Sequence, residues 1–238
     1  MERFINTVIA TCDYVKGRKR SKKTINLSFD EWNVWYHAFP ENARLVHWQK
    51  APKFNEDIYN FEDALFAGLA LITLLRHADR VKMACLAQLV NVIAPIMTTA
   101  GGLYKQPIYY PYFHASKYGR GTALNCVIES PKYESSDFGP VDSLDSIAIH
   151  NGEEDSLTIF AVNRDSGGDI EAHYTLGGFA GYGRAEHICM TNPDLKAVND
   201  MNCPDRVKPA QRDGASIEGE SLRVIFPKLS WNVVRLVK

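Results

Sequence analysis

The pattern of apolar residues changes near residue 121, and this change constrains the fold more than any other feature of the sequence. Before it, long helix-like segments alternate with strand-like segments. After it, the chain breaks into short runs in which apolar and polar residues alternate. A chain that changes in this way is expected to join an α/β portion to an all-β portion.

The first 120 residues contain too few strands to complete a sheet of their own. Apolar residues at helical spacing predict an amphipathic helix over residues 2–18, and an almost wholly apolar segment predicts a buried helix over 61–78. Strands are expected at 25–29 and in the first part of 80–97, whose remainder is ambiguous between helix and strand. A final helix is expected at 107–118. Two strands with three helices are only a part of an α/β domain.

The second portion has the pattern of an antiparallel β-sandwich. Its alternating runs lie at residues 124–128, 146–149, 157–162, 171–176, 185–190, 222–226 and 231–237. Turn-forming pairs such as Asn151-Gly152 and Asp213-Gly214 separate several of them. Short alternating strands divided by turn signals are typical of a sandwich. We therefore predict two domains, at residues 1–120 and 121–238.

Composition excludes some classes of protein. A 238-residue chain that is 45% hydrophobic can bury a substantial core, and its net charge of -1 argues against a nucleic-acid partner. The basic run at 16–23 is either a solvated helix end or an RNA-binding or localisation signal, and cations suit a helix C-terminus. The longest apolar run, residues 64–75, is too short to span a bilayer, so no membrane partner is expected.

The cysteines and the N-terminus predict a cytoplasmic location. Five scattered cysteines without a CxxC or Cys/His cluster argue against a structural zinc site and suit reduced thiols. The segment after Met1 is amphipathic and lacks the apolar core of a signal peptide.

One segment indicates chemistry. The strand-like run that starts at Ile25 ends in two acids, Asp30 and Glu31, followed by Trp32 and Trp35. A carboxylate beside indoles at a strand end is suited to cleaving a glycosidic bond. The carboxylate stabilises or attacks an oxocarbenium-like carbon, and indole faces pack against the sugar. Taken alone, Glu31 is equally well read as a solvated acid, and a glycosidase needs a second carboxylate.

Three stretches resemble one family, the α-L-arabinofuranosidases of glycoside hydrolase family 51. They are F-D-E-W-N-V-W-Y at 29–36, L-A-Q-L-V-N-V-I-A-P-I at 86–96 and the tyrosine-rich 109–112, and they occur in the family's order. The resemblance implies the C-terminal portion of a (β/α)8 barrel followed by a β-sandwich. Residues 1–120 would hold barrel strands seven and eight, whose C-terminal ends form active sites in such barrels.

The resemblance also implies roles for single residues. Glu31 matches the nucleophile of a retaining mechanism, Trp35 a residue that lines the sugar site, and Gln88 an amide that binds arabinose. We expect Trp32 to be a core residue and Asp30 an orienting or structural acid. His37 and His47 are either structural or substrate contacts. The tyrosines of 109–112 are expected to pack the last helix against the barrel wall. No metal or organic cofactor is implied.

The acid/base of the family is missing from this chain. In the family it follows an asparagine at the end of strand four, upstream of everything present here. Asn55-Glu56 is an Asn-Glu pair, but no strand is predicted before it. Loss of general acid catalysis lowers the rate by about 10²–10⁴-fold.

Two functional hypotheses remain open. The first is a retaining α-L-arabinofuranosidase that removes terminal groups from arabinans, arabinoxylans and their oligosaccharides, with a role in L-arabinose metabolism and hemicellulose degradation. The chain would then be truncated. The second is a non-catalytic fragment that binds carbohydrate or assembles with a separate N-terminal half. The family often forms hexamers, so a homo-oligomer is implied as well.

Overall fold

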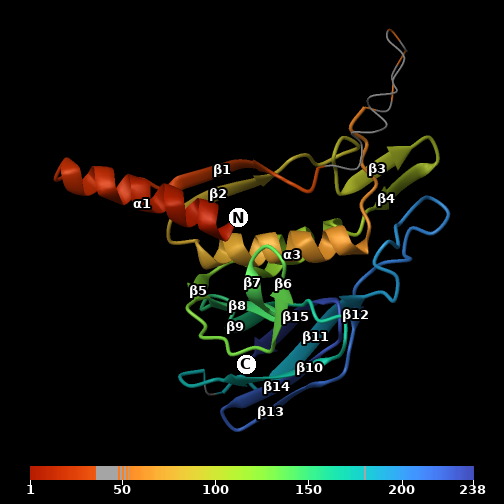
Figure 1. Cartoon of the computed structure of the whole chain (residues 1–238). Coiled ribbons are helices and arrows are strands. Elements are labelled where there is room, and N and C mark those ends of the chain that lie inside the picture. Colours follow the sequence, from red (N-terminus) through yellow and green to blue (C-terminus); the bar gives the residue numbers. More distant parts are fainter. Residues whose placement is uncertain (36–47, 49, 51, 53, 180) are drawn as a thin grey trace.

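A computed structural model of the chain describes residues 1–35, 48, 50, 52, 54–179 and 181–238. Helix α1 (Glu2–Arg18) and the strands β1 (Leu27–Trp32) and β2 (Val81–Leu86) lie on one side of helix α3 (Phe61–Arg76). The β-sandwich lies on the other side of α3 (Figure 1). The long helix is therefore the middle layer of the molecule.

Among its described residues, the barrel-like portion contains one parallel strand pair. β1 and β2 pair from Leu27 opposite Val81 to Trp32 opposite Leu86, with α3 as the crossover between them. A capping box starts α3, since Asn60 accepts from the Asp63 N–H and Asp63 accepts from the Asn60 N–H. The predicted helices at 2–18 and 61–78 are confirmed. The strand predicted at 25–29 begins two residues later and extends to Trp32.

The ambiguous part of 80–97 resolves into a loop and the start of a hairpin. Strands β3 (Ile96–Thr99) and β4 (Gly102–Lys105) pair around the glycine turn at residues 101–102. Helix α4 (Tyr109–Tyr118) follows, which confirms the final helix. The hairpin was not predicted from the sequence.

The remaining strands form the two sheets of the sandwich and one separate hairpin. They are β5 (Thr122–Leu124), β6 (Lys132–Ser135), β7 (Gly139–Asp142), β8 (Leu144–Asn151), β9 (Ser156–Asn163), β10 (Ile170–Thr175), β11 (Arg184–Thr191), β12 (Ala210–Gln211), β13 (Ala215–Glu218), β14 (Ser221–Phe226) and β15 (Ser230–Val237). One antiparallel sheet has the order β12-β11-β15-β9-β8-β5 and the other β10-β14-β13, while β6 and β7 form a separate hairpin. The sandwich prediction is confirmed, but the run at 124–128 is a strand only up to Leu124, and β6, β7, β12 and β13 were not predicted.

Both faces of the larger sheet are covered. One face packs against the three-stranded sheet through residues such as Ile159 and Phe226. The other face packs against α3 and α4 through residues such as Phe160 and Trp231. All eight residues of β9 are buried for this reason. This second core contains residues from both sides of position 120, so the packing is continuous there. The domain boundary at 120/121 stays a prediction.

Trp231 is the centre of that second core. Its indole packs against Phe160 with ring centroids 5.7 Å apart, and its Nε1–H donates to Nδ1 of His114 on α4 over 3.0 Å. A Cβ on Gly68 of α3 would lie 2.6 Å from Trp231 Cε3. The helix therefore approaches the sheet this closely only because Gly68 has no side chain.

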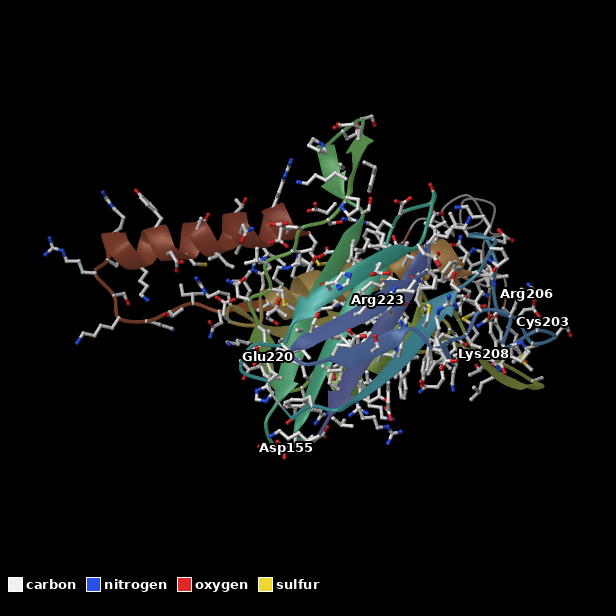
Figure 2. All side chains as sticks on the ribbon, turned by 90° about the horizontal axis from the view of Figure 1, so that it is seen from below. Asp155, Cys203, Arg206, Lys208, Glu220 and Arg223 are labelled. Carbon is white, nitrogen blue, oxygen red and sulfur yellow. The ribbon has the colours of Figure 1, made fainter. Side chains whose placement is uncertain are left out.

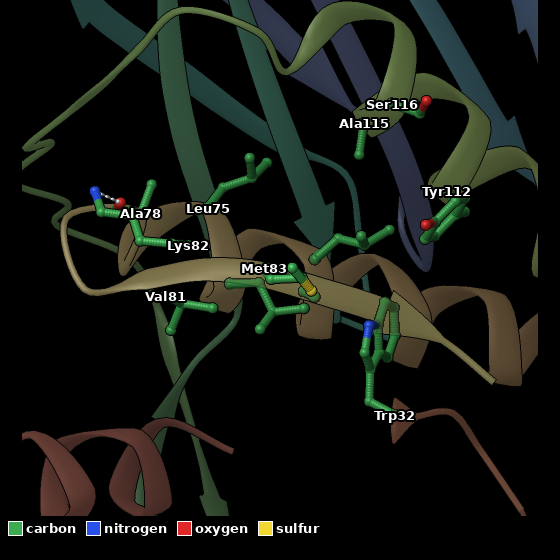
Figure 3. Close-up of a pocket in the computed structure, with 12 residues that line it drawn as sticks. Trp32, Leu75, Ala78, Val81, Lys82, Met83, Tyr112, Ala115 and Ser116 are labelled. Atoms are coloured by element: carbon green, nitrogen blue, oxygen red, sulfur yellow. Dashed lines mark hydrogen bonds between the residues drawn. The ribbon is translucent and has the colours of Figure 1, made fainter. Parts of the chain in front are cut away.

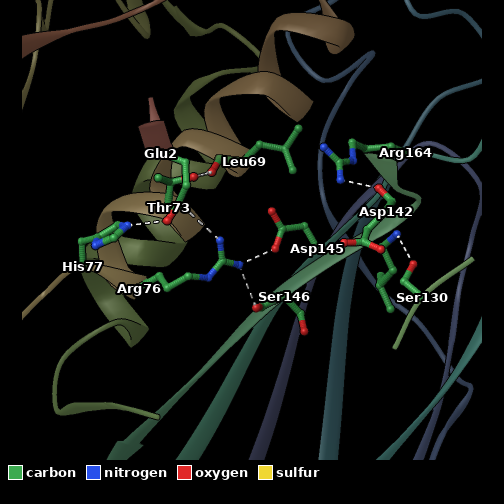
Figure 4. A network of polar contacts seen from close by, with 11 residues as sticks. Glu2, Leu69, Thr73, Arg76, His77, Ser130, Asp142, Asp145, Ser146 and Arg164 are labelled. Atoms are coloured by element: carbon green, nitrogen blue, oxygen red, sulfur yellow. Dashed lines mark hydrogen bonds and ion pairs between the residues drawn. The ribbon is translucent and has the colours of Figure 1, made fainter. Parts of the chain in front are cut away.

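A polar network joins the three layers at the end of α3 (Figure 4). Arg76 pairs with Glu2 of α1 over 3.6 Å and with Asp145 of β8, and it donates to the Ser146 carbonyl over 3.4 Å. Nε2 of His77 lies 2.6 Å from a carboxylate oxygen of the same Glu2. Because Glu2 and Arg76 are partly exposed, we expect each pair to contribute about 1 kcal/mol or less.

The outer face of the smaller sheet carries polar side chains, Arg223 among them (Figure 2). Arg223 pairs with Glu171 of the neighbouring strand over 2.5 Å, and this bond lowers the pKa of Glu171 to about 2. The structure describes all five cysteines, and none is in a disulfide. Among the described residues, no helix is both long and apolar enough to cross a membrane.

Candidate active site

The site begins where the two parallel strands end. Glu31 is the penultimate residue of β1, and Gln88 lies two residues beyond β2. The Ala87 N–H donates to the Trp32 carbonyl over 3.1 Å, so the two chains stay paired past the end of β2. Both side chains, Glu31 and Gln88, are exposed. The structure thus brings these two predicted residues to the same edge of the sheet.

An irregularity in β1 decides which side chains face the core. Leu27 and Phe29 are half-buried, but the pairing register shifts between Phe29 and Trp32. As a result Trp32 is buried while Glu31 is exposed, although strict alternation places Glu31 with the apolar residues. The register shift explains why alternation fails at this end of the strand.

Trp32 is a core residue, as expected. It packs against Tyr112 of α4 with ring centroids 6.4 Å apart. Tyr112 thereby joins the last helix to the barrel strand as predicted, whereas Tyr109 and Tyr110 belong to the core that the helices share with the larger sheet. The two rings line a cavity of about 300 Å³ between β2, α3 and α4 (Figure 3). The indole Nε1 of Trp32 is buried without a hydrogen-bond acceptor among the described residues.

Trp35 lies at the surface, three residues beyond β1. Its side chain is 47% exposed and lines a cavity of about 410 Å³ with Val34 and Phe66. Glu62 and Asp63 at the start of α3 complete the polar side of this cavity. Asp63 is buried in its capping box, so Glu62 is the exposed carboxylate beside the indole, whose ring face is suited to contact the C–H groups of a sugar.

Of the other candidate residues, the structure describes Asp30 and the Asn55-Glu56 pair but not the two histidines. Asp30 accepts a hydrogen bond from the Ser28 hydroxyl, which agrees with a structural or orienting acid. Glu56 is half-buried in irregular backbone ahead of α3, and Asn55 before it has a φ of 55°. His37 and His47 lie outside the described residues, and so does Tyr36 of the family motif.

Three scaffold residues of the site were not found by sequence reasoning: Asn33, Tyr59 and Gln106. The Tyr59 hydroxyl donates to the Val34 carbonyl over 2.6 Å, and burial raises the pKa of this hydroxyl. Gln106 Oε1 accepts from the Tyr59 N–H over 2.8 Å. Partners of these side chains such as the Ala94 and Ile93 carbonyls lie 12 to 60 positions away, so the local sequence gives no signal for them.

Within the described ranges, no three His, Cys, Asp or Glu side chains are grouped so as to hold a metal ion. The strand ends offer an exposed carboxylate and an exposed amide, while the indole of Trp35 lines a cavity with residues of α3. These are the groups that bind a sugar and attack its anomeric carbon.

Comparisons with known proteins point in the same direction. Residues 30–230 match the model of the α-L-arabinofuranosidase C-terminal domain. The intracellular exo-α-(1→5)-L-arabinofuranosidase 1 of Bacillus subtilis is 53% identical over the whole chain and 47% of its own length. An exo-α-(1→6)-L-arabinofuranosidase of Bifidobacterium longum is 38% identical over 99% of the chain and 46% of its own length.

Solved structures share the fold. The family 51 α-L-arabinofuranosidase of Bifidobacterium longum superimposes with a TM-score of 0.89 at 33% identity, covering 99% of this chain and 46% of that one. A family 51 arabinofuranosidase from Xanthomonas axonopodis pv. citri gives a TM-score of 0.83 at 26% identity, covering 99% and 45%. The chain therefore spans about half the length of the relatives that it matches.

Proposed function

The chain belongs to the α-L-arabinofuranosidases of glycoside hydrolase family 51, as their C-terminal part, and we propose that it carries the nucleophile of such an enzyme. The observation that carries the proposal is the position of Glu31 and Gln88 at the C-terminal ends of adjacent parallel strands. Barrel enzymes bind substrate at this end of their strands. The substrates proposed are the terminal α-L-arabinofuranosyl groups of arabinans, arabinoxylans and their oligosaccharides.

The proposed mechanism is retaining. The Glu31 carboxylate attacks the anomeric carbon, and the bond from that carbon to the leaving oxygen breaks. The leaving oxygen takes a proton from an acid outside this chain. Water then attacks the arabinosyl ester, releasing arabinose and restoring the carboxylate. Trp35 is proposed to line the sugar site and Gln88 to hydrogen-bond the arabinose.

We propose that the acid/base comes from residues outside this chain. The relatives are about twice as long as this chain, which leaves room for a complete barrel and its second carboxylate. We propose that this chain acts together with such a segment, whether covalently joined or supplied as a separate half. The relatives from three bacteria are named intracellular, which supports a location inside the cell.

The experiment replaces the nucleophile in a completed enzyme. The chain is joined to the upstream half of the Bacillus subtilis relative, and hydrolysis of an aryl α-L-arabinofuranoside is measured. We expect Glu31→Ala to lower kcat on the order of 10⁴-fold or more, because the covalent step loses its nucleophile. Azide, a small anion that can enter the vacated space, should restore turnover by forming the arabinosyl azide.

The matched control is Asp30→Ala, which removes the adjacent carboxylate. It should lower the activity much less than Glu31→Ala does, and it should not respond to azide. Activity that survives Glu31→Ala unchanged would contradict the nucleophile assignment. A completed enzyme that binds arabino-oligosaccharides but hydrolyses none would favour the non-catalytic alternative.

A further inference from the structure

Asn33 joins the end of β1 to the loop that follows β2. Its Nδ2 group donates to the carbonyls of Ala87 and Ile93, each over 2.6 Å, and its Oδ1 accepts from the Val34 N–H over 2.8 Å. One side chain next to the strand that carries Glu31 therefore holds both ends of the segment that carries Gln88. An aliphatic side chain at this position would remove the Asn33 donor from both carbonyls, and the Ile93 carbonyl would keep only the donation from the Gln88 N–H.

Gln106 holds the same loop from the other side. It is fully buried, and its Nε2 group donates to the carbonyls of Ala94 over 2.7 Å and Asp57 over 2.9 Å. Its Oε1 accepts from the Tyr59 N–H over 2.8 Å. Asn33 and Gln106 thus donate to the consecutive carbonyls of Ile93 and Ala94. We call these two side chains the amide clamp.

The clamped loop needs outside support because its own backbone is strained. Asn91 has a φ of 63° and Ile93 a φ of 39°, a region that a β-branched residue rarely occupies. Within the loop, the Gln88 N–H donates to the Ile93 carbonyl over 3.1 Å. The position of Gln88 therefore depends on the position of Ile93, which the clamp fixes.

We propose that Asn33 and Gln106 are positioning residues that hold Gln88 in register with Glu31 for catalysis. The proposal rests on the proposed function, since it concerns the same site. The clamp acts through the backbone of the loop and does not itself contact the sugar. Its loss lets the Gln88 segment move relative to β1, and small displacements of this kind lower rates by about 10²-fold.

The test uses near-isosteric variants of the completed enzyme, Asn33→Asp and Gln106→Glu. Each keeps the accepting oxygen and removes both donations. Asn33→Ala removes the same donations without adding a charge beside the nucleophile. We expect kcat/KM for an aryl arabinofuranoside to fall by about 10²-fold in all three, at a temperature where each protein is folded.

The matched control is Asn163→Asp in the sandwich. Asn163 is fully buried, as Gln106 is, donates to the carbonyls of Phe226 over 3.0 Å and Gly168 over 3.3 Å, and accepts from the Asp165 N–H over 2.9 Å. The variant Asn163→Asp therefore loses the same kind of side-chain hydrogen bonds as the clamp variants, but at a position in the sandwich. Its kcat/KM should stay within about threefold of the parent value. If the clamp variants lose no more than this control, the proposal is wrong.

Hydrogen exchange tests the clamp without any catalysis. The N–H groups of Gln88 and Ile93 should exchange faster in the clamp variants than in the parent, while those of β9 stay protected. Unchanged exchange in both would overturn the proposal even if activity fell. If Glu31→Ala kept full activity, the proposed function would fail, and the exchange result would still decide whether the clamp orders the loop.

Discussion

At the scale of single residues, His114 couples the stability of the chain to pH. Burial, with a smaller effect of the Lys117 charge, lowers its pKa from 6.5 to about 4. Its Nδ1 accepts from the Trp231 indole, so the native contact needs the neutral ring. Between these two pKa values, His114 is therefore protonated in the unfolded chain and neutral in the folded chain. The contribution of His114 to the unfolding free energy is fully present above pH 6.5 and is lost as the pH falls towards 4.

The variant His114→Gln isolates this contribution. Glutamine keeps an acceptor for the Trp231 N–H and does not titrate. Between about pH 7 and about pH 4, we expect the parent to lose about 3 kcal/mol more unfolding free energy than the variant. Urea unfolding at a series of pH values gives the difference. Two curves that run parallel across this range would show that His114 is not the coupled group.

At the scale of elements, the fit of α3 onto the sandwich depends on Gly68. A methyl group there would lie 2.6 Å from Cε3 of Trp231, which is fully buried and cannot move aside easily. We expect Gly68→Ala to lower the unfolding free energy by about 1–3 kcal/mol, even though alanine favours the helix. Thermal and urea unfolding of the chain measure the change.

The control for this prediction is Gly17→Ala in α1. No atom lies within 4 Å of the Cβ that it would add, so only the helix propensity changes. It should be neutral or stabilise by up to about 1 kcal/mol. Equal effects of the two substitutions would mean that the close contact between α3 and β15 relaxes without cost.

The sequence predicted those elements whose pattern is local. The amphipathic spacing of α1, the apolar length of α3 and the alternation in most sandwich strands each depend on residues a few positions apart. The hairpin β6–β7 was missed because its strands are short and polar and include Pro140. The loop between β2 and β3 was missed because its shape depends on distant amides rather than on a local pattern.

The residues of the candidate site also differ in whether the sequence alone could identify them. Glu31 could be singled out because it lies in a dense local motif at a strand end, whereas Gln88 was assigned only from the family resemblance. Gln106 gave no such signal, since its partners Asp57 and Tyr59 lie 49 and 47 positions away. The exposure of Glu31 also required the structure, because a register shift overrides the alternation that the sequence implies.

At the scale of the whole molecule, the strand pair β1–β2 differs from the sandwich in what covers it. Within the part of the chain that the structure describes, each of these strands pairs with the other and with no third strand. Met83 on β2 is 57% exposed and lines the cavity of about 300 Å³ beside Trp32 and Tyr112. Open strand edges next to apolar surface promote self-association. We therefore expect the chain alone to aggregate as its concentration rises.

The substitution Met83→Lys tests where this association occurs. A lysine on an open strand opposes edge-to-edge pairing, so the concentration at which light scattering begins should rise roughly twofold or more. The matched control is Met201→Lys, which adds the same charge at another exposed methionine, in the loop between β11 and β12. If the control helps equally, net charge rather than the open strand limits solubility. A parent chain that stays monomeric and melts cooperatively at high concentration would show that the β1–β2 pair is stable without further strands.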